Sequence, residues 1–88
     1  MPKMVMTHKV VEIDRWLQGK AERAATVGDF ATNVTDHVAL DGSNEIAVTA
    51  DVHDPEGIRA MLASPPADVA ARMERHGVIP PIAVYVER

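Results

Sequence analysis

Two residues of this sequence are suited to proton-transfer chemistry. His8 lies in a run of apolar and β-favouring residues, and Asp36 lies between Val34 and Val38 in another such run. An imidazole titrates near neutral pH, and a carboxylate that orients it makes it a general base. A carboxylate among apolar neighbours is unfavourable unless it is paired or hydrated. We therefore predict a catalytic pair of His8 and Asp36. The alternative is that Asp36 turns to solvent and His8 bonds a backbone carbonyl.

Four further residues are predicted to contact a ligand near this pair. Ala50, on the strand between His8 and Asp36, leaves room between the two side chains, and Trp16 bridges a helix and the sheet. Methionine is flexible and polarisable, which suits a ligand surface and a core alike. The predicted ligand-binding residues are Trp16, Met6, Met61 and Ala50. The alternative is that Trp16 and the methionines only fill the core.

A metal site and a serine nucleophile are both disfavoured. His37, Asp51 and His53 have the composition of a two-histidine, one-carboxylate metal site. On a hairpin, however, His53 would lie about 13–20 Å from His37 at a rise of ~3.3 Å per residue. Metal–ligand bonds of about 2 Å exclude a shared ion at that separation, so no metal is predicted. Ser43 and Ser64 do not lie in a nucleophile-elbow pattern.

The composition excludes several classes of function. The 88 residues carry a net charge of −4, only 3% of them are aromatic, and none is cysteine. Nucleic-acid binding needs a basic surface and stacking side chains, so no nucleic-acid partner is expected. Without cysteine there is no disulfide and no thiolate nucleophile. No apolar stretch has the length of a membrane span or a signal peptide, so we predict a cytoplasmic protein without a membrane partner.

The element that must position these residues is a β-hairpin. Thr32–Leu40 and Glu45–Val52 both alternate between apolar and polar residues, as strands with one buried face do. Asp41-Gly42-Ser43-Asn44 between them has the composition of a tight turn. The predicted sheet therefore has one apolar face and one face of small and polar side chains.

Two more strands and a helix are predicted around this hairpin. Met4–Val10 and Ile82–Val86 alternate as strands, and Val78-Ile79-Pro80-Pro81 reads as an extended linker. Apolar residues from Ile13 to Ala24 recur at helical spacing, which places the charged residues of this helix, including Glu22 and Arg23, toward solvent.

Two further helices are predicted between Asp54 and Gly77. Asp54-Pro55-Glu56 combines an N-cap, a proline at the first helical position and an acidic residue in the first turn. Ser64-Pro65-Pro66 ends this helix and begins another, which runs to His76 with Gly77 as its C-cap. A cationic His76 there is favoured by the helix dipole. The residues predicted to face the sheet are Ile58, Met61, Leu62, Val69, Ala70 and Met73.

The resulting order predicts an α+β fold of the ferredoxin-like type. The elements follow the βαββαβ order: strand, helix, strand, strand, broken helix, strand. This order is typical of a four-stranded antiparallel sheet with the helices on one face. Strands one and three are expected in the middle and strands two and four at the edges. Residues 1–88 form a single domain with a small core, so we predict that it forms a homodimer.

Five short segments, in this order and spacing, resemble small bacterial proteins of the dimeric α/β-barrel superfamily, which includes antibiotic-biosynthesis-monooxygenase-like domains. They are Thr7-His8-Lys9-Val10, Asp14-Arg15-Trp16-Leu17, Asn44-Glu45-Ile46, Met61-Leu62-Ala63-Ser64-Pro65, and His76-Gly77-Val78 followed by Pro80-Pro81. The resemblance implies a ferredoxin-like protomer whose sheet packs against that of a second protomer to form a barrel. Some members are cofactor-independent oxygenases, isomerases or haem enzymes, with a pocket between sheet and helices.

Two functions follow from these observations. The first is a small-molecule site between sheet and helices, with cofactor-independent oxygenase or isomerase chemistry on a cyclic organic substrate and no bound cofactor. The second is a non-catalytic dimerising module whose core is filled by its own side chains. An enclosed cavity of a few hundred Å³ with His8 in its wall favours the first, and a packed interior favours the second.

Overall fold

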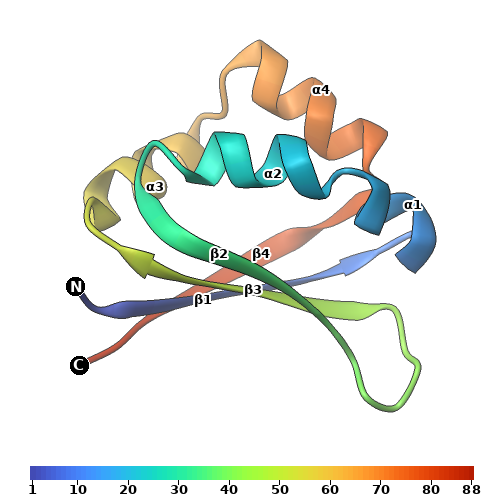
Figure 1. Cartoon of the computed structure of the whole chain (residues 1–88). Helices are drawn as coiled ribbons and strands as arrows, with labels where there is room; N and C mark the ends of the chain where they lie inside the picture. Colours follow the sequence, from blue (N-terminus) through green and yellow to red (C-terminus); the bar gives the residue numbers. More distant parts are fainter.

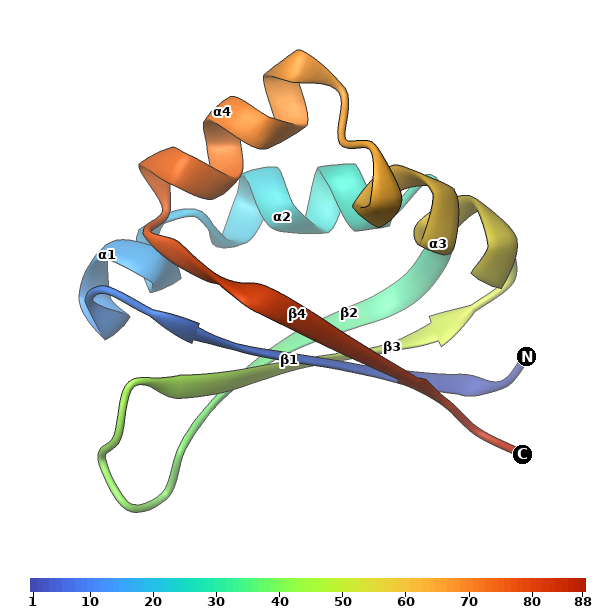
Figure 2. The same cartoon turned by 180° about the vertical axis from the view of Figure 1, so that it is seen from behind.

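The computed structural model describes residues 1–88 as a four-stranded antiparallel sheet with four helices on one of its faces (Figure 1). The opposite face carries no helix, and both termini lie at the same end of the sheet (Figure 2). In chain order the elements are β1 (Lys3–Val10), α1 (Ile13–Gln18), α2 (Lys20–Val27), β2 (Ala31–Val38), β3 (Glu45–Val52), α3 (Pro55–Ala63), α4 (Ala67–Arg75) and β4 (Val78–Val86).

The strands lie in the order β2-β3-β1-β4, and each neighbouring pair is antiparallel. β1 is joined to β2 through α1 and α2, and β3 is joined to β4 through α3 and α4, as in the split βαβ arrangement. The predicted α+β ferredoxin-like fold and its strand order are confirmed. None of the four helices has the length and apolar composition needed to cross a lipid bilayer.

The core lies between the sheet and the helices. Alternate residues of β1 and β3 point into it, which is the period-two pattern of a half-buried sheet. Burying a large aliphatic side chain contributes about 1.5–3 kcal/mol. The buried apolar residues are Met4, Met6, Val10, Trp16, Val27, Ala31, Ile46, Val48, Ala50, Val52 and Ile58.

The hairpin departs from the prediction at two places. Asn33 has a φ of 55°, and the pairing of β2 with β3 shifts by one residue between Thr32 and Thr35, which is a bulge. Farther along, Val38 is half exposed and Leu40 is fully exposed. The hairpin extends beyond the helices at this end, so no helix covers its apolar side chains there (Figure 1). The apolar face predicted up to Leu40 is therefore wrong in its last part.

The predicted first helix is broken at Gly19 into α1 and α2. The break changes the direction in which the second part faces. Ala21 and Ala24 belong to the apolar residues at helical spacing, for which burial is predicted, but both are exposed. Arg23, predicted to face solvent, turns toward the sheet. Any side chain at position 19 would collide with the imidazole of His76. Glycine at this position lets α1–α2 approach the end of α4 without displacing the His76 imidazole.

The helices that follow the hairpin begin and end where predicted. Asp54 Oδ1 accepts a hydrogen bond of 3.0 Å from the Gly57 amide, and Pro55 occupies the first helical position of α3. Gly77, just after α4, has a φ of 75°, the left-handed conformation that a helix C-cap requires. The prediction that Ala70 faces the sheet is wrong, because α4 has no buried residue and Ala70 is exposed.

The segment predicted as a linker is the first part of β4. Val78 pairs with Val10, and Ile79 pairs with Lys9, so the strand begins four residues earlier than predicted. The register then shifts opposite Pro80 and Pro81, which have no N–H group to donate to a neighbouring strand. A bulge at this point explains how an edge strand contains two prolines.

Replacing Asp54 with alanine is expected to destabilise the protein by about 1 kcal/mol, because the N-cap bond to the Gly57 amide is lost. Urea denaturation measures this loss. Glu74→Ala is the matched control, since Glu74 is exposed on α4 and its side chain makes no hydrogen bond. Equal stabilities of the two variants would show that Asp54 does not cap α3.

Candidate functional site

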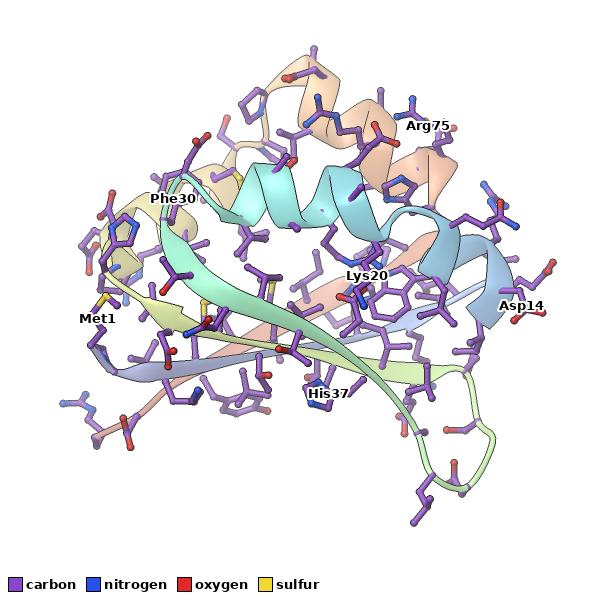
Figure 3. All side chains as sticks on the ribbon, in the orientation of Figure 1. Met1, Asp14, Lys20, Phe30, His37 and Arg75 are labelled. Carbon is purple, nitrogen blue, oxygen red and sulfur yellow. The ribbon has the colours of Figure 1, made fainter.

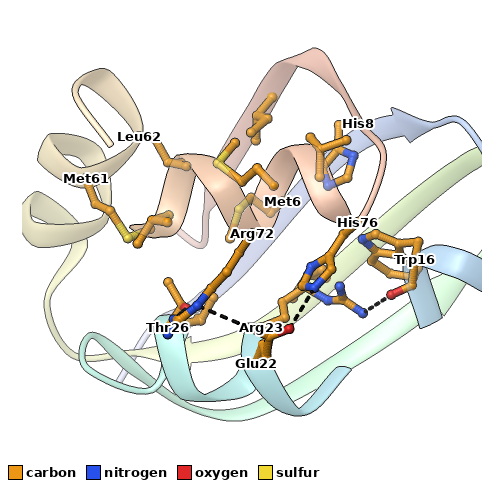
Figure 4. A pocket seen from close by; sticks show the side chains of 16 residues that line it. Met6, His8, Trp16, Glu22, Arg23, Thr26, Met61, Leu62, Arg72 and His76 are labelled. Carbon is orange, nitrogen blue, oxygen red and sulfur yellow. Dashed lines mark hydrogen bonds and ion pairs between the residues drawn. The ribbon is translucent and has the colours of Figure 1, made fainter. Parts of the chain in front are cut away.

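A cavity of about 80 Å³ lies between the sheet and the helices (Figure 4). Strands β1, β3 and β4 form its floor, and all four helices contribute to its walls. Most of the lining is apolar, as in sites for small organic molecules. The apolar lining residues are Met6, Trp16, Val27, Val48, Met61, Leu62, Val69, Met73, Val78 and Ile82.

One side of the cavity is polar, where α2 faces α4. Glu22 joins the two helices: its Oε2 lies 2.6 Å from Arg75 Nη2, and its Oε1 lies 3.2 Å from His76 Nε2. Both hydrogen bonds lower the pKa of Glu22, and the one to Arg75 has the larger effect. Arg72 Nη1 donates to Thr26 Oγ1 at 2.8 Å. His76 lies at the C-terminal end of α4, as predicted, and its buried imidazole in addition contacts a carboxylate on α2.

His8 lies at the end of the cavity next to Trp16 (Figure 4). Its Nδ1 is 2.8 Å from the Lys9 carbonyl oxygen. Because a carbonyl only accepts, the neutral imidazole carries its proton on Nδ1 and keeps a lone pair on Nε2. Burial lowers the pKa of His8 from 6.5, the Lys9 carbonyl opposes this effect, and the charge of Arg23 lowers the pKa further. His8 is thus a neutral imidazole with a free acceptor nitrogen at neutral pH.

Asp36 does not bond His8, and the predicted direct pair is corrected. Its carboxylate, only 4% exposed, receives Arg23 Nε at 3.1 Å and Arg23 Nη2 at 2.8 Å. Such two-pronged pairing satisfies a buried carboxylate. His8 pairs with Ile46 and Asp36 with Val48 across β3, so the two residues share a face without being opposite one another.

Three of the four predicted ligand contacts line the cavity, namely Trp16, Met6 and Met61. Ala50 does not. It is fully buried opposite Met4 and lies outside the cavity lining, so it leaves no room between His8 and Asp36. The residues of β3 opposite His8 and Asp36 are Ile46 and Val48, so the prediction placed Ala50 two residues or more from its true position along β3.

Trp16 connects the charged and neutral groups of the site. Its indole contacts the His8 ring edge-on at a centroid distance of 6.2 Å, and the Arg23 guanidinium carbon lies 3.9 Å from the indole centroid. Arg23 Nη2 also donates to the Trp16 carbonyl oxygen at 3.1 Å. His8, Trp16 and Arg23 therefore form one cluster, which joins β1, α1 and α2.

Arg23 and Glu22 are the site residues that the sequence pattern missed. Both were assigned to the solvent face of a continuous helix. The signal that would have placed them correctly is Gly19, since a glycine in a helical pattern permits the break that turns α2.

His37, Asp51 and His53, the residues of the rejected metal site, lie outside the cavity. Figure 3 shows His37 on the side of the sheet that faces away from the helices. Asp51 Oδ1 is 2.8 Å from Lys3 Nζ, and Asp51 Oδ2 accepts a bond of 2.7 Å from Asn33. The hydrogen bonds from Asn33 and Lys3 both lower the pKa of Asp51, and the bond from Asn33 has the larger effect. No three His, Asp or Glu side chains in the structure are close enough together to hold a metal ion.

Comparison with solved structures identifies the fold. The chain superposes on an antibiotic biosynthesis monooxygenase with a TM-score of 0.66, at 11% identity, over 100% of this chain and 97% of the other. SnoaB, a cofactor-independent oxygenase from Streptomyces nogalater, matches with a TM-score of 0.68 at 16% identity, over 99% and 92% of the two chains. A dimeric ferredoxin-like protein from an uncultured marine organism matches with a TM-score of 0.55 at 13% identity, over 98% and 95%.

No protein-family model and no curated protein sequence matches this chain. The structural matches extend over nearly the whole chain, so this protein has the fold of the antibiotic-biosynthesis-monooxygenase-like proteins. The predicted resemblance is confirmed at the level of the fold. The solved structures with this fold include monooxygenases, and one of them is a cofactor-independent oxygenase.

His8 is expected to titrate below 6.5, because burial and the charge of Arg23 both disfavour its cationic form. NMR titration of the imidazole carbon-bound protons measures this. In the Arg23→Met/Asp36→Leu variant the nearby cation is gone, and the His8 pKa should move part of the way back toward 6.5. A His8 pKa above 6.5 in the native protein would contradict this geometry.

Proposed function

We propose that this protein is a homodimer that binds a cyclic organic molecule between sheet and helices and oxidises it with molecular oxygen, without a bound cofactor. The observation that carries the proposal is the neutral His8, with its free Nε2 at the end of an apolar cavity. A neutral imidazole in an apolar site is suited to removing a weakly acidic proton.

The reaction consumes one molecule of oxygen and releases water. His8 Nε2 takes a proton from a ring CH2 group that is acidified by a neighbouring carbonyl, and the resulting carbanion transfers electrons to oxygen. The carbon–oxygen bond that forms gives a hydroperoxide, which loses water and leaves a second ketone. The carbanion itself supplies the electrons, so no flavin or metal is needed.

The size of the cavity requires part of its wall to move. A site for an organic molecule has about 300 Å³ or more, and this cavity has about 80 Å³. α4 forms the outer wall through Val69 and Met73, and it has no buried residue. A segment with little buried apolar surface opens at low free energy, so α4 is the element that should move when a ligand enters.

The dimer would form through the helix-free face of the sheet. This face carries small and polar side chains from all four strands, and an open groove of about 700 Å³ is bounded in part by Thr7, His37, Ala47 and Ala83. Because helices cover only one face of the sheet, the other face is exposed in the single chain. The sheet of a second copy is the simplest structure that covers it. The predicted interface residues are Asn33, Thr35, Ala47, Thr49, Ala83 and Tyr85.

Light scattering is expected to give twice the chain mass of 9.5 kDa. Tyr85→Arg places a charge on the helix-free face, where Tyr85 is 62% exposed in the single chain, and should yield a monomer. A native protein that stays folded at the monomer mass at micromolar concentration would rule out the dimer.

Oxygen uptake with β-tetralone and with a cyclic dione tests the oxygenase proposal. Both probes contain a ring CH2 next to a carbonyl, and the expected result is uptake above the rate in buffer together with a product that carries one more carbonyl. If the protein leaves both rates unchanged but exchanges the ring protons with deuterated water, it is an isomerase-type proton-transfer protein instead.

The small cavity volume also favours a second candidate, the non-catalytic dimerising module. In that case the apolar side chains pack well enough that no ring compound enters. The module predicts neither oxygen uptake nor proton exchange, and it predicts an unchanged melting temperature in the presence of either probe.

A further inference from the structure

Two buried N–H groups at the His8 end of the cavity have no protein partner. Trp16 Nε1 and Arg23 Nη1 are both inaccessible and neither donates to a protein acceptor. Trp16 is fully buried, and the Arg23 side chain is 11% exposed. A buried donor without an acceptor is unfavourable by about 1–3 kcal/mol. Such donors in a cavity wall therefore point to an acceptor that comes from outside the chain.

The remaining donors of Arg23 are fully used. Nε and Nη2 bind the two oxygens of Asp36, and Nη2 also binds the Trp16 carbonyl oxygen. These bonds hold the guanidinium in a fixed orientation over the indole, at 3.9 Å from the ring centroid. Nη1 is the one nitrogen left over, and it is held rigidly beside a residue whose own N–H is also unused.

We propose that Trp16 Nε1 and Arg23 Nη1 form a subsite for the phenolate or enolate oxygen of a ring compound bound in the cavity. This subsite rests on the proposed ligand pocket and specifies what that pocket selects. Figure 4 shows Trp16, Arg23 and His8 at the same end of the cavity. A ring that enters with its oxygen toward these donors presents its adjacent C–H or O–H to His8, and loss of that proton creates the negative charge that the donors bind.

The subsite selects an oxygen anion for two physical reasons. Both groups are donors only, so an ammonium or another N–H donor is rejected. Asp36 already compensates the charge of Arg23, so a full counter-ion such as a phosphate gains little, whereas an oxygen with charge spread over a ring needs only hydrogen bonds.

Binding of para-nitrophenolate, with para-nitrotoluene as the matched control, tests the subsite. The two probes have the same ring and nitro group, and a neutral methyl group in the toluene takes the place of the phenolate oxygen. The expected result is that the phenolate binds about tenfold or more tightly than the toluene. The single indole N–H resonance of this one-tryptophan chain should move downfield with the phenolate and stay in place with the toluene.

Replacing Trp16 with benzothienylalanine exchanges the indole N–H for sulfur and keeps the ring, and Trp16→Phe is the second variant. In both, the preference for the phenolate should fall about fivefold or more, while binding of the toluene changes little. An unchanged preference, or equal binding of the two probes to the native protein, overturns the subsite but leaves the pocket intact. Binding of neither probe overturns the subsite and the pocket together. A phenolate preference without oxygen uptake supports the subsite and removes the oxygenase.

Discussion

Arg23→Met is expected to destabilise the protein by about 3–5 kcal/mol, because it leaves the Asp36 carboxylate buried without a partner. Small domains have a free energy of unfolding of about 5–15 kcal/mol, so this single change should remove a large part of the stability of the protein. Two hydrogen bonds to Asp36 and one to the Trp16 carbonyl oxygen are lost together. Chemical denaturation followed by the fluorescence of Trp16 measures the effect.

Two further variants show whether the buried charge is the cause. Arg59→Met removes an arginine that is 80% exposed and 3.9 Å from Glu56, and exposed pairs contribute about 0–1 kcal/mol. Arg23→Met/Asp36→Leu removes both charges and should regain most of the lost stability. If Arg23→Met is no worse than Arg59→Met, Asp36 is not buried as the structure has it.

His8→Asn is expected to reduce turnover about 10²–10⁴-fold, which is the usual contribution of a general base. Asparagine retains an N–H near the position of Nδ1, so the bond to the Lys9 carbonyl can persist while the Nε2 lone pair is lost. Folding should therefore be largely preserved. Oxygen uptake by the native protein should rise with pH through the lowered pKa of His8, so the midpoint of the rise should lie below pH 6.5.

The matched control is His53→Asn, because His53 is exposed and lies outside the cavity. Its turnover should equal that of the native protein. If His8→Asn fails to fold, His8 is a structural histidine. If it folds and retains full turnover, His8 is not the base.

The lowered pKa of His8 also links its protonation to stability. The unfolded state, with a pKa near 6.5, binds the proton more readily than the folded state. The contribution of His8 to stability is therefore complete above about pH 6.5. It decreases as the pH falls through 6.5 toward the folded pKa, and His8→Asn should remove this part of the pH dependence.

Alternation and capping signals were sufficient to predict the sheet order and most element boundaries. Strict alternation in Glu45–Val52 and the Asp54-Pro55 start of α3 depend on local chemistry that a sequence displays directly. The direction in which α2 faces cannot be read from local chemistry in this way. It follows from the break at Gly19, where the chain lies against His76, a residue far away in the sequence. A helix that turns by even one residue brings a different set of side chains into the core.

The candidate site was predicted in part for the same reason. His8, Trp16, Met6 and Met61 lie on elements whose buried face was correctly predicted, and they line the cavity. Asp36 was expected either to point inward toward His8 or to turn to solvent. The structure buries it, but its partner comes from α2, where the predicted face was wrong. The prediction for Ala50 failed because the cross-strand register depends on the geometry of the turn as well as on alternation, and this register places Ile46 and Val48 opposite His8 and Asp36.

The most direct test of the central claim is the methyl NMR spectrum of protein labelled at its five methionines, recorded with and without β-tetralone. Met6, Met61 and Met73 line the cavity, whereas Met4 is buried elsewhere and Met1 is exposed, so the last two are controls within the same spectrum. A ligand between sheet and helices should shift the signals of Met6, Met61 and Met73, and leave those of Met1 and Met4 in place. If the methyl signals of Met6, Met61 and Met73 do not shift even at the highest soluble concentration of β-tetralone, the interior is filled and this protein has no small-molecule site there.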